Sequence, residues 1–216
     1  MDVIQAIKQR RSCRKYMEKP VEFEKVSMVI EAGHHAPSAG NLQSWKFIII
    51  TEKEIIKHIA NYAFQQFWIE TAPVVIAVCS YDEKQERHYG EVGKTLYATQ
   101  GCAAAIQNML LTATALDLGC CWVGGFERDK VHDLLKIPTN VNLQALITLG
   151  YADEKPAEKT MADLYTCVYF NSYGASIAKM HMVLGNYSIE WEKKIEENKS
   201  KLHKIFGKIK EKVKKK

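Results

Sequence analysis

Four short, nearly continuous apolar runs constrain the fold of this chain more than any other feature. They occupy residues 45–51, 74–79, 120–123 and 145–150. Each is too short for a membrane span and has the make-up of a strand that is buried on both faces. Segments with helical character separate the runs, and this alternation is typical of a sheet packed between helices. We therefore expect an α+β fold of three α/β/α layers, with a central mixed sheet flanked by helices.

Helices are expected at residues 3–7, 26–33, 54–62, 91–118 and 130–135, and a further strand-like run lies at 164–170. The long helix within 91–118 carries small and apolar residues on nearly every face between Gly101 and Ala115. A helix that is apolar all round must be buried all round. We therefore expect this helix to be central or shared with a second subunit.

The C-terminal part of the chain differs from the rest. Residues 193–216 hold eleven lysines and three glutamates, a net charge of +8, and the rest carries −3 because the whole chain carries +5. Apolar residues recur there at helical spacing, which predicts an amphipathic helix. We expect one domain at 1–174 and a Lys-rich helical extension at 175–216. The extension could pack on the body or on a partner subunit. It could also contact a membrane surface or nucleic acid, but the sequence gives no firm evidence for either.

Composition excludes several classes. Apolar residues make up 47% of the 216 residues and charged ones 25%, as in ordinary globular proteins. The N-terminus lacks the pattern of a secretory signal, so we expect a cytoplasmic protein. The six cysteines form no Cys-x-x-Cys pair, so no metal site is predicted. Cys13 lies among arginines, which would lower the pKa of its thiol and make it a candidate reactive group.

Three segments carry residue types suited to a nucleotide-like cofactor. Arg10, Arg11 and Arg14 would fall within one helical turn, a density of positive charge that suits a phosphate. The segment 36–44 supplies a hydroxyl and amides next to a buried strand, and Gly124–Gly125 lets a backbone approach a flat ligand closely. Taken singly, each also fits a solvated helix end or an ordinary turn. Their order along one chain favours the cofactor.

That order resembles the nitroreductase family of FMN-dependent oxidoreductases. The family's motifs match at these places: Arg-Arg-Ser-x-Arg at 10–14, Ala-Pro-Ser-x-x-Asn-x-Gln-x-Trp at 36–45, Ala-Pro-Val-Val at 72–75, a Leu-Gly pair followed by Trp and Gly at 118–124, Leu-Gly-Tyr-x-x-x-x-Pro at 149–156, and Tyr-x-x-x-Tyr-Gly at 169–174. The match covers roughly residues 1 to 174. Ser44 stands where many members have proline, and residues 175–216 match no motif of the family.

The resemblance implies FMN held between the two subunits of a homodimer. Arg10, Arg11 and Arg14 would contact its phosphate and a ring oxygen, with help from Ser12. The ring or ribityl chain would meet loop residues, some of them from the second subunit, and lie on the glycine turn with a backbone N–H facing the nitrogen that carries the hydride. These loop and turn residues, with Gln66, are Pro37, Ser38, Ala39, Asn41, Gln43, Gln66, Val123, Gly124 and Gly125. Lys159 is the candidate for a further phosphate ligand, although the family's second basic residue beside it is absent.

The implied activity is hydride transfer from NAD(P)H through bound FMN to nitroaromatics, quinones or similar electron-poor acceptors. Because the two substrates would use the cofactor in turn, we expect ping-pong kinetics and no obligate acid–base residue. An alternative interpretation is a flavin-binding sensor or storage protein whose basic tail contacts a membrane or nucleic acid.

Overall fold

The computed structural model describes residues 1–157 and 159–175. The chain divides into two compact units, Met1–Glu158 and Lys159–Lys216, and each unit is described by itself. The expected domain boundary at 174/175 stays a prediction. The expected helical extension falls on 176–216 and so lies outside the described residues, apart from Ala175. Within the described part of the chain, no helix is long and apolar enough to cross a membrane.

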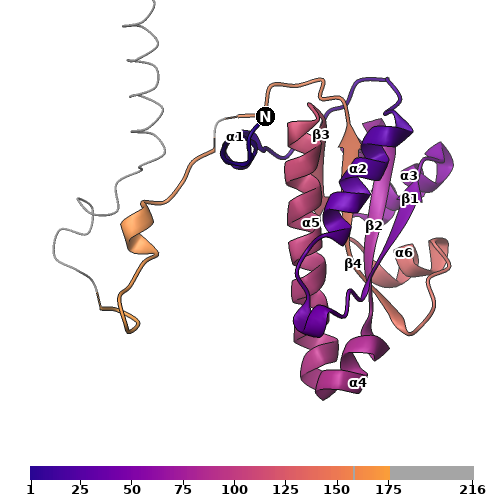
Figure 1. Cartoon of the computed structure of the whole chain (residues 1–216). Helices are drawn as coiled ribbons and strands as arrows, with labels where there is room; N and C mark the ends of the chain where they lie inside the picture. Colours follow the sequence, from indigo (N-terminus) through magenta and orange to yellow (C-terminus); the bar gives the residue numbers. More distant parts are fainter. Residues whose placement is uncertain (158, 176–216) are drawn as a thin grey trace, which may run out of the picture. The chain divides into compact units, whose positions relative to one another are not determined.

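A four-stranded sheet forms the centre of the first unit (Figure 1). Its strands lie in the order β1 (Trp45–Ile50), β2 (Val74–Tyr81), β4 (Val141–Gly150) and β3 (Gly119–Val123). All three neighbouring pairs are antiparallel, so the expectation of a mixed sheet was wrong for these strands. Continuous apolar runs indicated burial on both faces, and burial does not fix strand direction.

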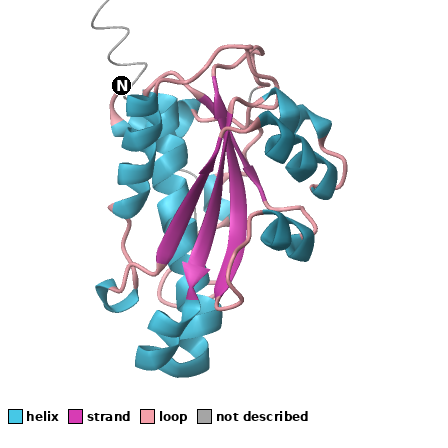
Figure 2. Cartoon of the chain, turned by 90° about the vertical axis from the view of Figure 1, so that its right-hand side faces the viewer, coloured by secondary structure: helices cyan, strands magenta, loops and turns pink. Residues whose placement is uncertain are grey.

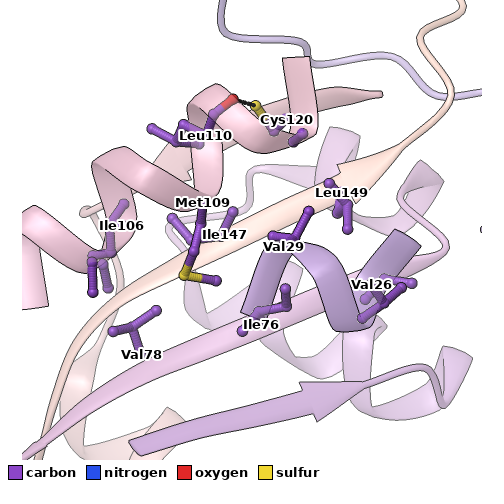
Figure 3. Close-up of a cluster of buried hydrophobic side chains, with 14 of the residues drawn as sticks. Val26, Val29, Ile76, Val78, Ile106, Met109, Leu110, Cys120, Ile147 and Leu149 are labelled. Atoms are coloured by element: carbon purple, nitrogen blue, oxygen red, sulfur yellow. Dashed lines mark hydrogen bonds between the residues drawn. The ribbon is translucent and has the colours of Figure 1, made fainter. Parts of the chain in front are cut away.

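Helices cover both faces of the sheet, as Figure 2 shows, and this confirms the expected three layers. On one face, α2 (Phe23–His34) and α5 (Ala98–Ala115) pack on the side chains of Ile76, Val78 and Ile147 (Figure 3). On the other face, α3 (Lys53–Tyr62), η2 (Phe67–Thr71) and α6 (Arg128–Leu134) cover Val75, Ala77 and Leu146. The sheet therefore separates two apolar cores, one on each of its faces.

The N-terminal helix α1 (Val3–Gln9) begins with a capping box, in which the Asp2 side chain accepts a hydrogen bond from the backbone of Gln5. The helix ends before Arg10, and the chain continues extended, with Ser12 in an isolated parallel bridge to Cys120. The expected helical turn through 10–14 is therefore wrong, because this segment pairs with the edge of the sheet. In an extended segment alternate residues share a side, so Arg10, Ser12 and Arg14 still face one way.

The segment expected as one helix over 91–118 is built from three pieces. A separate helix, α4 (Asp82–Val92), kinks at Gly90, where φ is +60° and ψ is −149°. The π-helix η3 (Gly93–Tyr97) follows it, and α5 continues to Ala115. The charged sequence of α4 has few apolar residues to set a period, which is why sequence analysis missed it.

α5 is buried on the sheet side and half-buried or exposed elsewhere. Met109, Ile106 and Ala105 are fully covered, whereas Gln100 and Gln107 are exposed and Leu111 is half-buried. The prediction of burial on all sides is therefore wrong for the single chain. The apolar stripe that stays half-buried leaves room for the second prediction, that a partner subunit shares this helix.

The second unit contains a short helix instead of the expected strand over 164–170. This helix is η4 (Leu164–Thr166), and residues 164–167 are exposed in the structure. A strand-like composition reflects packing against neighbouring strands, and this run has none among the described residues. Further on, the Tyr169 and Tyr173 rings lie with their centroids 4.8 Å apart around a turn at Asn171.

Candidate flavin site

The candidate site begins at β3, the edge strand of the sheet. The extended N-terminal segment lies along this edge, where the Cys13 backbone N–H donates to the Cys120 carbonyl at 2.9 Å. On the other side, Cys120 is anchored to α5, since its Sγ lies 3.7 Å from the Leu110 carbonyl oxygen (Figure 3). The core thus fixes the strand that positions the arginine segment.

Arg10, Ser12 and Arg14 act together on Cys121, two residues before the end of β3. Burial raises the pKa of the Cys121 thiol, while the Arg14 charge, a hydrogen bond with Ser12 and the Arg10 charge lower it. Ser12 is paired with β3 at Cys120, and Arg10 and Arg14 flank it on the same side of the extended segment. Two guanidinium groups and a hydroxyl gathered there form a donor set suited to a phosphate.

Arg11 faces a different group. Its Nη1 donates to the carbonyl oxygen of Lys8, in the last turn of α1, at 2.5 Å and to that of the C-cap residue Arg10 at 2.9 Å. A side chain used in this way stabilises the helix end. Its role as a flavin ligand stays a prediction.

Arg14 is held in place from two directions. Its backbone N–H donates to Glu154 Oε1 at 2.5 Å, and its guanidinium carbon lies 5.8 Å from the centroid of the Trp68 ring. An arginine over an aromatic face keeps its donors free at the rim. Sequence analysis gave Trp68 no role, and only its position two residues after Gln66 pointed to it.

The turn after β3 forms the second part of the site. Val123 is buried, while Gly124 and Gly125 are exposed and bring no side chain to the surface. The Gln66 side chain joins this turn, because its Nε2 donates to the Gly125 carbonyl at 3.1 Å and to the Ala63 carbonyl at 2.8 Å. The structure thus brings Gln66 and the glycine turn together. The Gln66 amide nitrogen is hydrogen-bonded to the backbone carbonyls on both sides.

The loop before β1 has a defined and strained conformation. Ser38 Oγ accepts a hydrogen bond from the Gln43 backbone N–H at 2.9 Å, across the short helix η1 (Ala39–Asn41). Gly40, Asn41 and Gln43 all adopt left-handed backbone angles, with φ of 57°, 53° and 51°. Pro37 and Asn41 are exposed. The loop therefore offers polar groups to a ligand from a backbone whose conformation is fixed without the ligand.

This loop lies apart from the arginine segment within one chain. It leads into β1, the edge strand opposite β3, and Ser38 packs near Gly101 in the first turns of α5. The arginine segment lies at β3, which is anchored near Leu110 in the second half of the same helix. One chain therefore assembles the arginines, Gln66 and the glycine turn, and presents the loop elsewhere.

Strained backbone concentrates in the candidate segments. Seven residues other than glycine have positive φ in the described part of the chain, and four of them are Asn41, Gln43, Phe64 and Gln65. Such conformations cost energy and occur in tight turns and at ligand sites. Two loops that contain or adjoin predicted flavin residues therefore have costly backbone conformations.

Lys159 begins the second unit and is exposed. Its predicted contact with a phosphate stays a prediction.

A cavity of 660 Å³ lies between the 16–21 segment and the start of α3, and none of the predicted flavin residues lines it. Arg10, Ser12, Arg14, Gln66 and the glycine turn lie instead along β3 and the turn that follows it.

Cys13 corrects a prediction about reactivity. The thiol is 1% exposed, and burial raises its pKa from the ordinary value, assisted by the nearby Glu154 carboxylate. Arg10 and Arg14 face the other side, since side chains alternate along an extended segment. The Arg11 guanidinium donates to the carbonyls of Lys8 and Arg10. A candidate reactive thiol at Cys13 is therefore excluded by its surroundings.

Comparison with known proteins decides the family. The sequence description of the nitroreductase family matches residues 7–71 and 63–151. The chain belongs to the nitroreductase family. It is accordingly an oxidoreductase.

Individual relatives agree with this assignment. A protein of Methanothermobacter thermautotrophicus with the provisional name NADH dehydrogenase/NAD(P)H nitroreductase is 35% identical over 167 residues, which span 76% of this chain and 84% of the relative. The NADPH-flavin oxidoreductase of Vibrio harveyi is 27% identical over 80% of this chain and 75% of its own. The solved FMN-dependent nitroreductase of Clostridium difficile has a TM-score of 0.68 at 27% identity, covering 79% of this chain and 99% of that chain.

Proposed function

We propose that this nitroreductase-family protein binds FMN and transfers hydride from NAD(P)H to electron-poor acceptors such as nitroaromatics and quinones. The observation that carries the proposal is that the extended segment with Arg10, Ser12 and Arg14 lies along the edge strand β3, which is followed by Gly124–Gly125. A donor set for a phosphate and a bare backbone turn for a flat ring lie on one strand. The names of the relatives from Vibrio harveyi and Clostridium difficile support the choice of flavin.

The described residues fit an FMN molecule. Arg10, Ser12 and Arg14 supply charged and neutral donors for the phosphate and a ring oxygen. A Cβ built on Gly124 would have Trp122 Nε1 as its nearest neighbour at 3.8 Å, so the turn offers an open, flat approach. When bound there, FMN would supply the hydride chemistry. The protein would contribute a backbone N–H at the ring and positive charge near its carbonyl oxygen, which favour negative charge on the reduced cofactor.

A homodimer would complete the site. The Pro37–Gln43 loop carries predicted flavin contacts and lies away from the arginine segment of its own chain. A two-fold axis can bring the loop of one subunit to the turn of the other. The half-buried stripe of α5, with exposed Val92 and Leu96 before it, provides apolar surface for such contact.

In each turnover the donor and the acceptor would use the same face of the flavin ring in turn. The donor would bind over the ring, leave, and be replaced by the acceptor, which predicts parallel lines in double-reciprocal plots. We assign no acid–base residue to the reaction. Arg10 and Arg14 have a positioning and charge-stabilising role, and specificity would depend on groups around the glycine turn.

The absorption spectrum of the purified, FMN-reconstituted protein under anaerobic NADH or NADPH tests the proposal. We expect bound-flavin bands that bleach on addition of the donor and return when a quinone is added. Bands that stay oxidised with both donors would contradict NAD(P)H dependence and favour a sensor or storage protein. Absence of flavin binding would contradict the site itself.

A further inference from the structure

The Tyr16 side chain joins the arginine segment to the interior of the protein. It is 5% exposed and belongs to a small buried cluster that includes Cys13 and has Trp68 packed against it. The Trp68 ring is the one that faces the Arg14 guanidinium. The Tyr16 ring also lies on the backbone at the end of β4, since a Cβ built on Gly150 would come within 2.8 Å of Tyr16 Cδ1.

The Tyr16 hydroxyl fixes the peptide group between two predicted FMN ligands. Its Oη donates to the Cys13 carbonyl oxygen at 2.8 Å. The Cys13 backbone N–H donates to the Cys120 carbonyl at 2.9 Å, so both polar backbone groups of Cys13 are bound. Ser12 and Arg14 flank Cys13 in the sequence. The hydroxyl therefore helps to set the direction in which these two side chains leave the segment.

A second buried hydroxyl supports the first. Thr148 Oγ1 on β4 lies 2.6 Å from Tyr16 Oη and 3.5 Å from the Cys121 carbonyl oxygen. The Tyr16 hydroxyl has a single proton, which it gives to the Cys13 carbonyl, so the Thr148 hydroxyl is the donor to Tyr16 Oη. Burial raises the pKa of the Tyr16 hydroxyl, so the proton stays in place at neutral pH. Two hydroxyls thus link the arginine segment to β4.

The backbone of Tyr16 binds a third element. Its N–H donates to Thr71 Oγ1 at 3.3 Å, and Thr71 Oγ1 donates to the Trp68 carbonyl at 2.8 Å. Tyr16 is therefore bonded both to the sheet and to η2, which carries Trp68. Because its ring is buried, Tyr16 can act on a ligand only through the residues that it holds.

We infer that Tyr16 is a positioning residue of the flavin site, whose hydroxyl holds Ser12 and Arg14 in the geometry that binds the FMN phosphate. The inference rests on the proposed function and goes beyond it, because it assigns a role to a side chain that the cofactor does not touch. A site that is ordered before its ligand arrives loses less entropy on binding and so binds more tightly. The gain is confined to ligands that use these donors.

Riboflavin, which is FMN without the phosphate, separates this role from a general effect on the fold. The test titrates the full-length apoprotein with FMN and with riboflavin, and compares the two Kd values in the wild type, Tyr16→Phe and Tyr81→Phe. Tyr81→Phe is the matched control, because it removes a hydroxyl that donates to Glu83 at 2.8 Å. Tyr81 pairs with the start of β4, whereas Tyr16 packs at its end.

We expect Tyr16→Phe to raise the Kd for FMN about threefold to tenfold and to leave the Kd for riboflavin near its wild-type value. Tyr81→Phe should change neither. Thr148→Val should have a smaller effect in the same direction as Tyr16→Phe, because the Cys13 carbonyl keeps its donor. Thr148→Ser retains a hydroxyl and should restore the wild-type ratio of the two Kd values.

A wild-type ratio of the two Kd values in Tyr16→Phe would overturn this inference alone, whether both ligands bind as before or both are weakened alike. If Tyr16→Phe does not fold, the comparison of Thr148→Val with Thr148→Ser decides in the same way. A wild type that binds FMN no better than riboflavin would overturn the phosphate site, and with it the proposed function.

Discussion

Arg14 shows how much one residue can depend on its neighbours. The Trp68 ring and the Glu154 carboxylate hold its side chain and backbone, while Arg10 and Ser12 lie along the same side of the segment. Sequence motif and structure agree on which residue types gather here. They differ in the backbone conformation that brings these residues together, because an extended segment paired with β3 replaces the expected helical turn.

Arg14→Ala should weaken FMN binding about tenfold to a hundredfold, since a hydrogen bond to a charged group contributes ~1.5–3 kcal/mol. Titration of the apoprotein with FMN, followed by flavin fluorescence, measures the change. Arg11→Ala is the matched control, because Arg11 donates to the carbonyls at the end of α1. It should lower stability more than flavin affinity. A larger loss of affinity in Arg11→Ala would contradict this placement of the two side chains.

The thiols give a prediction that needs no cofactor. All six cysteines fall within the described residues, and Cys167 is the exposed one. Burial raises the pKa of Cys13 and raises that of Cys120 to about 12. We expect a thiol reagent at neutral pH to modify one cysteine rapidly in the native protein and the others only on unfolding. Rapid modification that persists in Cys167→Ser would contradict the buried positions.

Among the elements, the loop before β1 shows what sequence can and cannot predict. Its Pro, Ser, Gly and Asn content indicated a turn, but not three left-handed residues or the contact of Gly40 with α4. That contact joins residues far apart in the chain. It also involves Tyr89 in a helix that sequence analysis missed, because its charged residues set no apolar period.

Gly40→Ala should destabilise the fold by about 1–2 kcal/mol, because φ is +57° at this position. The new Cβ would also lie 2.6 Å from Tyr89 Oη, so that side chain must move. In a Tyr89→Phe background the atom nearest to the new Cβ is the ring Cζ at 3.4 Å. The loss of stability on Gly40→Ala should then be that of the backbone strain alone. Denaturant unfolding of the four proteins measures both effects. Equal costs in the two backgrounds would show that the Tyr89 contact is unimportant.

The start of α2 is tied to the end of β4 through a titratable group. Tyr151 Oη donates to Glu22 Oε2 at 2.6 Å, and this bond is the main cause that lowers the pKa of the Glu22 carboxyl. A lowered pKa in the folded state stabilises the protein above the ordinary carboxyl range. That contribution is lost as pH falls through the lowered pKa.

Glu22→Gln should therefore be less stable than the wild type at neutral pH, and the two should converge as the pH is lowered below the carboxyl range. Urea unfolding midpoints measured across pH test the expectation. A stability difference that stays constant from neutral to acid pH would contradict the link to the Glu22 charge.

On the scale of the whole molecule, sequence predicted the layers and all four strands, because apolar runs and their burial are properties of the chain itself. Strand direction depends on pairing between distant segments, as in the antiparallel β2–β4 ladder, and so was missed. The same limit applies to the site. Motifs named its residues, and only the structure separated the Pro37–Gln43 loop from the arginine segment of the same chain.

The central claim is that each flavin site draws its arginines and glycine turn from one subunit and its loop from the other. Mixed dimers of Arg14→Ala and Asn41→Gly subunits test it, since glycine readily adopts the left-handed backbone at position 41 and the substitution removes the amide side chain. The measurement is an FMN titration of the mixture after subunit exchange. We predict that half of the sites in mixed dimers recover wild-type affinity, because one site then has both halves intact. A mixture in which no site recovers would contradict a site shared between subunits.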